Sequence, residues 1–89
     1  MDELLHCIEK YLNGELSAEQ FSYEFPSIYL FYMHERNIDE QYVDALDDIS
    51  EACGWYEPNP LHRQDDDGYI GEEELREIIL EKYQWLKST

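Results

Sequence analysis

The sequence predicts an all-α fold, a small antiparallel four-helix bundle with a long acidic loop before its last helix. Two observations support this fold class. Apolar residues recur three or four positions apart in four separate segments, as they do on the buried face of a helix. Capping residues or glycines stand near the ends of these segments. The 89 residues, 43% of them hydrophobic, are expected to form a single domain, residues 1–89, around one core.

The first two predicted helices are separated by a stop signal and a start signal. The first helix covers Glu3 to Asn13, and Gly14 can end it because glycine readily adopts the left-handed conformation of a helix cap. Ser17 and Gln20 have the spacing of a capping box, so the second helix should begin there. The apolar stripe of the first helix consists of Leu4, Leu5, Ile8 and Leu12.

The second helix carries a proline in its interior. Pro26 lacks a backbone N–H, so we expect a kink or a break near Phe25. Residues 21–25 also alternate between aromatic and polar side chains, which would suit a strand, but the capping box and the flanking helices favour a helix. The predicted inward stripe consists of Phe21, Phe25, Ile28 and either Phe31 or Tyr32.

The third helix is predicted from a capping signal, Asn37 followed by Glu40, to about Trp55, whose indole we place in the core. Its inward stripe consists of Tyr42, Leu46, Ile49 and Cys53. Residues 57–71 show no periodicity and are expected to form a charged loop. The last helix begins with three glutamates, Glu72, Glu73 and Glu74, whose negative charge suits the positive end of a helix dipole. It should bury Leu75, Ile78, Ile79, Leu86, and either Tyr83 or the stem of Lys82.

Negative charge is concentrated in the second half of the chain. Fifteen of the 22 acidic residues lie between Asp39 and Glu81 against two arginines, a net charge of −13 out of −16. Nucleic acid is excluded as a direct ligand, because phosphate binding needs clustered Lys and Arg. A strongly basic protein is the expected partner. On the third helix, Asp44, Asp48 and Glu51 should share an exposed face, and the loop adds Asp65, Asp66 and Asp67.

Other classes of function find little support. The chain has no run long enough to span a membrane and no basic signal segment, so it reads as a cytoplasmic protein. No nucleophile elbow, phosphate loop or zinc spacing is present, so we expect neither an enzyme nor a cofactor. Cys7 and Cys53 should be buried thiols, with a disulfide or a metal site as alternatives.

A calcium loop is the sharpest local alternative. With Gly68 as the turn glycine, Asp65, Asp67 and Glu74 take ligand positions of an EF-hand. Arg63 stands at the first ligand position, however, where the ion needs an oxygen. An acidic turn that leads into an acidic helix start is the simpler interpretation.

Tyrosine is unusually frequent in the chain, with eight residues. Most should lie at the edge of the core with the hydroxyl in water. Tyr56 and Tyr69 differ because they flank the acidic loop, where aromatic rings beside carboxylates are typical of an interface anchor.

Over most of its length the chain resembles the colicin D immunity proteins and the related immunity proteins of contact-dependent growth inhibition systems. The resemblance rests on four segments in order: Leu16–Phe21, Trp55-Tyr56-Glu57-Pro58, Tyr69-Ile70, and Glu73–Arg76. It implies a four-helix bundle that binds one nuclease toxin, often a tRNA-cleaving one, and covers its basic substrate site. It also implies that Tyr56, Glu57 and Pro58 lie at the toxin contact.

The expected function is therefore a non-enzymatic immunity protein of the bacterial cytoplasm. It would be a monomer when free and form a 1:1 complex with its cognate nuclease toxin. A DNA-mimicking decoy of a nucleic-acid-binding protein is the alternative from another class, and a calcium-binding module is a third.

Overall fold

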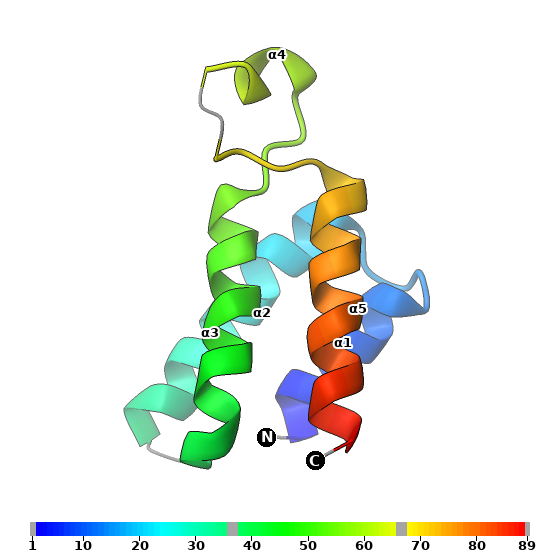
Figure 1. Cartoon of the computed structure of the whole chain (residues 1–89). Helices are drawn as coiled ribbons and strands as arrows, with labels where there is room; N and C mark the ends of the chain where they lie inside the picture. The colour runs from blue at the N-terminus through cyan, green and yellow to red at the C-terminus, as the bar shows by residue number, and fades with distance from the viewer. Residues whose placement is uncertain (1, 36–37, 66–67, 89) are drawn as a thin grey trace.

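The computed structural model describes residues 2–35, 38–65 and 68–88. Its secondary structure is almost entirely helical, and the described residues contain no β-strand (Figure 1). The prediction of an all-α fold is therefore confirmed. The helices are α1 (Asp2–Leu12), α2 (Ala18–Glu35), α3 (Glu40–Trp55), α4 (Pro60–Arg63) and α5 (Glu72–Ser88).

The predicted signals between α1 and α2 are both present. Gly14 has a φ of 83°, and its N–H donates to the Tyr11 carbonyl at 3.1 Å, so it caps the end of α1. Ser17 and Gln20 form a reciprocal capping box. The Ser17 Oγ accepts from the Gln20 N–H at 3.0 Å, and the Gln20 Oε1 accepts from the Ser17 N–H at 2.9 Å.

Helix α2 passes through Pro26 without interruption, so the break is wrong as one of the two predicted outcomes, a kink or a break. The strand alternative for residues 21–25 is also wrong. Aromatic packing explains why one missing donor is tolerated. The Phe25 ring is fully buried and stacks between Phe21 and Tyr29, with ring centroids 5.3 and 6.2 Å away. These contacts lie on both sides of Pro26 in the sequence and hold the two halves of the helix to the same core.

Helix α3 begins later than the capping signal suggested. Its N-cap is Asp39, whose side chain makes no cap hydrogen bond, and Asn37 lies outside the described residues. The end at Trp55 agrees with the prediction, but the core position of this residue does not. The Trp55 side chain is 39% exposed and packs on Tyr69, with ring centroids 5.7 Å apart. The inward stripe ends at Cys53, and Trp55 falls beyond it as the last residue of α3.

The segment between α3 and α5 is more ordered than a charged loop. The Asn59 side chain accepts from the Leu61 N–H at 2.9 Å, and Pro60 takes the first position of the one-turn helix α4. Tyr56 and Ile70 form an isolated parallel bridge through two backbone hydrogen bonds of 2.9 and 3.0 Å. This bridge fastens both ends of the segment together where α3 ends and α5 begins.

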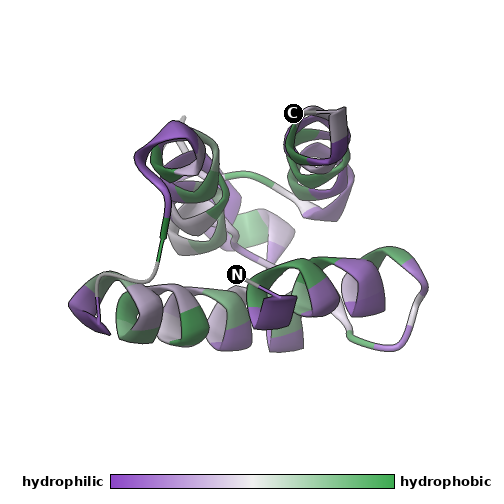
Figure 2. Ribbon diagram, turned by 90° about the horizontal axis from the view of Figure 1, so that it is seen from below, coloured by the Kyte–Doolittle hydropathy of each residue, from purple (hydrophilic) through white to green (hydrophobic). Residues whose placement is uncertain are grey.

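The long helices form two layers. Helices α3 and α5 lie side by side and run in opposite directions, while α1 and α2 run across them on one side (Figures 1 and 2). The fully buried side chains come from all four helices and include Leu4, Ile8, Phe21, Phe25, Leu46, Ile49, Leu75 and Ile79. Cys7 and Cys53 are free and buried, which confirms their prediction as core thiols. No helix in the described part of the chain combines the length and apolarity needed to cross a membrane.

Candidate protein-binding surface

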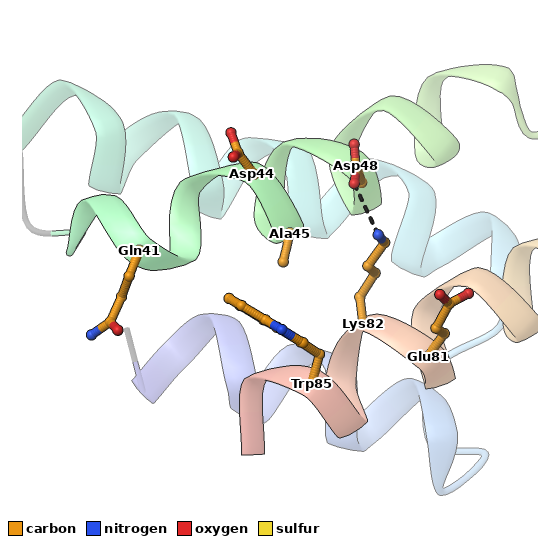
Figure 3. A pocket seen from close by; sticks show the side chains of 7 residues that line it. All are labelled: Gln41, Asp44, Ala45, Asp48, Glu81, Lys82 and Trp85. Carbon is orange, nitrogen blue, oxygen red and sulfur yellow. Dashed lines mark ion pairs between the residues drawn. The ribbon is translucent and has the colours of Figure 1, made fainter. Parts of the chain in front are cut away.

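A groove runs between α3 and α5, and its lining among the described residues includes none of α1 or α2. Its first hollow, of about 220 Å³, has the buried Ala45 at its floor and the indole of Trp85 on one side (Figure 3). Carboxylates rim this hollow from both helices, Asp44 and Asp48 from α3 and Glu81 from α5. The hollow thus combines a small apolar floor, an aromatic wall and an acidic rim.

A second hollow of about 300 Å³ continues the groove toward the end of α3. Ala52 lies at its base, and Trp55 and Ile70 supply apolar walls. The two hollows share Asp48 and Lys82. We call the two together, with these residues at their junction, the α3–α5 groove.

An ion pair crosses the groove at this junction. The Lys82 Nζ lies 3.0 Å from the Asp48 Oδ2 (Figure 3), and the side chains are 29% and 50% exposed. The hydrogen bond with Asp48 raises the pKa of Lys82, so the lysine remains a cation throughout the physiological range. Because both partners contact solvent, the pair contributes little to stability, typically about 0–1 kcal/mol.

Both tryptophans of the chain lie at this groove. Trp85 is 44% exposed and meets Tyr42 edge to face, with centroids 6.4 Å apart. Trp55 stands at the opposite end against Tyr69. Half-exposed indoles supported by a second ring are rigid, amphipathic groups of the kind enriched at binding hot spots.

The structure brings together only part of the predicted contact set. Asp44, Asp48 and Glu51 are exposed along the α3 side of the groove, and Tyr69 joins them through its contact with Trp55. Asp65 is exposed beyond α4, where its N–H donates to the His62 carbonyl at 3.1 Å. Asp66 and Asp67 lie outside the described residues.

Tyr56, Glu57 and Pro58 line other hollows, which share no residue with the α3–α5 groove. The Glu57 carboxylate accepts from the Asn59 N–H at 3.1 Å and lies 3.7 Å from the His62 Nδ1. Burial raises the pKa of the half-buried Tyr56. In the free protein Glu57 therefore shapes the turn into α4 at least as much as it presents charge to solvent.

The calcium-loop alternative gains no geometric support. The Arg63 guanidinium packs over Gly71 so closely that a Cβ at this glycine would come within 1.8 Å of the Arg63 Nη1, and it lies in a hollow with Glu72. The first ligand position therefore holds a cation turned toward the start of α5. Among the residues described, no group of three histidine, cysteine or acidic side chains is placed to hold a metal ion.

Sequence reasoning missed the contribution of α5, namely Glu81, Lys82 and Trp85. Trp85 does give a signal, because it lies off the stripe of Leu75, Ile79 and Leu86 while being a large apolar residue. What the sequence could not show is that it faces the acidic side of α3. Comparisons with protein-family models, curated proteins and solved structures give no match to this chain.

Proposed function

We propose that this protein is an immunity protein, which binds a cognate bacterial nuclease toxin in the cytoplasm and covers its basic active site. The observation that carries the proposal is the α3–α5 groove, where two half-exposed tryptophans stand among carboxylates of both helices. A basic, partly apolar protein surface is complementary to such a groove. The proposed inhibitor performs no chemistry of its own.

The partner class rests on charge and on the resemblance to colicin D immunity proteins. A nuclease must expose a basic site to bind phosphates, and a chain with net charge −16 is complementary to it. A tRNA-cleaving ribonuclease is the proposed target. The proposed inhibitor is monomeric when free and binds its toxin 1:1.

The physical mechanism separates capture from retention. Surface carboxylates steer the basic toxin into contact, and complementary charge raises association rates to about 10⁸–10⁹ M⁻¹s⁻¹ at low salt. The carboxylates then occupy positions that RNA phosphates would take. The indoles of Trp55 and Trp85 hold the complex by burying apolar surface, which affects mainly the dissociation rate.

Capture of the partner tests the proposal. The tagged protein is used to recover binding proteins from a strain that carries its gene neighbours, and the recovered material is assayed for tRNA cleavage before and after dissociation. Recovery of a basic protein whose nuclease activity returns on dissociation supports the proposal. Recovery of a DNA-binding protein without nuclease activity would favour the decoy alternative instead, and recovery of no basic protein would contradict both.

Stopped-flow kinetics with the recovered nuclease test the charge mechanism. Neutralising Asp44, Asp48 and Glu51 together as amides should slow association about tenfold at low salt and change dissociation much less. An association rate independent of salt would refute charge-steered capture. The matched control removes three charges from exposed positions outside the groove, as Glu3→Gln, Glu15→Gln and Glu24→Gln.

A further inference from the structure

The α3–α5 groove is interrupted at one point, and the interruption suggests what it binds. The Lys82 Nζ lies between its two hollows and is held by Asp48 at 3.0 Å. On either side are an apolar floor and an indole, Ala45 with Trp85 and Ala52 with Trp55. A cation thus already occupies the centre of an acidic, aromatic groove, and it comes from the protein itself.

We propose that the two hollows form a single docking groove for a helix of the basic partner, and that Lys82 is a placeholder for an arginine or lysine of that helix. The proposal rests on the proposed function for the identity of the partner. On binding, the Lys82 side chain swings aside and the partner's cation takes its place on Asp48. A guanidinium can contact both carboxylate oxygens, which a lysine ammonium does less well.

The spacing along α3 fixes the pattern that the partner helix must present. Ala45 and Ala52 are seven residues apart, which is about 10 Å along a helix axis, or two turns. Asp48 lies between them on the same face. A helix in this groove therefore places apolar side chains at positions i and i+7, one in each hollow, and its cation near i+4.

The negative charge of the groove favours a basic partner helix over a second copy of the chain. Each copy carries a net charge of −16, and the groove is rimmed by Asp44, Glu51 and Glu81. A second copy would bring further carboxylates toward this rim, whereas a basic helix would neutralise it. Displacing Lys82 costs little, because an ion pair that both partners share with solvent is weak.

A synthetic peptide tests the groove without the toxin. The probe is a 16-residue amphipathic helix with leucines at i and i+7 and an arginine at i+4, and its control carries glutamine at that position. Binding is followed by tryptophan fluorescence, since both indoles of the protein line the groove. The arginine peptide should shift the emission to shorter wavelength and bind at least tenfold more tightly than the glutamine peptide.

Two variants separate the placeholder from general charge attraction. Lys82→Met should tighten binding of the arginine peptide about threefold, because the competing cation is gone. Lys87→Met, the same charge change on the same helix but outside the two hollows, should leave it unchanged. Asp48→Asn should abolish the preference for arginine over glutamine.

The proposal is overturned if the peptide does not bind at millimolar concentration, if both peptides bind equally, or if Lys82→Met binds no more tightly than Lys87→Met. These outcomes are distinguishable from failure of the proposed function. Inhibition of a captured nuclease without peptide binding would retain the immunity function and remove this groove as its site. Peptide binding without recovery of a nuclease partner would retain the groove as a binding site for basic helices and remove the immunity function.

Discussion

Two buried tyrosines should respond in opposite directions to loss of the same oxygen atom. The Tyr11 side chain is 2% exposed, and its hydroxyl is buried without a hydrogen-bond partner among the described residues. Its ring packs on Phe21 with centroids 4.9 Å apart, and these contacts do not depend on the hydroxyl. The Tyr29 hydroxyl, in contrast, donates to the Asp47 carboxylate. Tyr11→Phe should therefore stabilise the fold, and Tyr29→Phe should destabilise it.

The magnitudes follow from hydrogen bonding. Burial of a hydroxyl without a partner costs about 1–3 kcal/mol, so Tyr11→Phe should raise the free energy of unfolding by about 1 kcal/mol. In a domain of this size that is a rise in Tm of about 4–8 °C. A hydrogen bond to a charged acceptor is worth about 1.5–3 kcal/mol, but Asp47 is exposed and regains water when the hydroxyl is removed. Tyr29→Phe should therefore lower the free energy of unfolding by only about 1 kcal/mol.

Urea unfolding followed by circular dichroism at pH 7 measures both changes. Equal destabilisation by the two substitutions would refute the reasoning, because it would mean that the Tyr11 hydroxyl has a partner in solution. Arg76 is the candidate: its guanidinium lies over the Tyr11 ring at 5.8 Å and opposes the larger effect of burial, which raises the pKa of Tyr11. In that case Tyr11→Phe and Arg76→Met would not be additive in the double variant.

Three further predictions concern the core and the caps. Ser17→Ala should lower the free energy of unfolding by about 1 kcal/mol, since it removes the capping box. The control is Ser27→Ala, at an exposed serine inside α2. A loss of stability in Ser17→Ala no larger than in this control would contradict the prediction. Cys7 and Cys53 should not react with Ellman's reagent at pH 8 until urea unfolds the protein, because burial raises their thiol pKa values to about 11 and about 12. Burial, followed by the hydrogen bond to Asp47, raises the pKa of Tyr29 above its ordinary 10.0, so the neutral phenol favours the fold. That stability should be complete below pH 10 and lost as the pH rises further, and the urea midpoint of Tyr29→Phe should fall less steeply above pH 10.

Local chemistry explains which parts of the fold could be predicted from the sequence. Gly14 and the Ser17–Gln20 pair act through backbone groups within a few residues, so their patterns are sufficient to place the end of α1 and the start of α2. The start of α5 at Glu72 was likewise predicted from its acidic first turn. The Asn59-Pro60 start of α4 carries an equally local signal, but the expectation of a charged loop over residues 57–71 does not use it.

The errors arise where contacts between distant segments decide the outcome. Pro26 is tolerated because the fully buried Phe25 belongs to a core that also contains residues of α1, α3 and α5. Trp55 lies beyond the inward stripe of α3, and its ring partner, Tyr69, comes 14 residues further along the chain. The α3–α5 groove also depends on contacts between segments that are distant in the sequence. Its acidic rim on α3 could be predicted from spacing, but its aromatic wall at Trp85 comes from a helix whose register against α3 depends on the whole core.

Three cations of the acidic half, Arg63, Arg76 and Lys82, have contacts within the chain itself. The Arg76 guanidinium donates to the Leu12 carbonyl at 3.0 Å, Lys82 is paired with Asp48, and Arg63 packs over Gly71. Arg76 and Arg63 thus act within the fold, one joining α5 to α1 and the other filling the hollow at the start of α5. Of the three, only Lys82 stands inside the groove and is held by a weak, solvent-exposed pair. The negative field of this half is therefore little reduced by its own cations. Lys82 reduces it inside the groove, and a basic partner can displace Lys82 more easily than the other two cations, because its ion pair is weak.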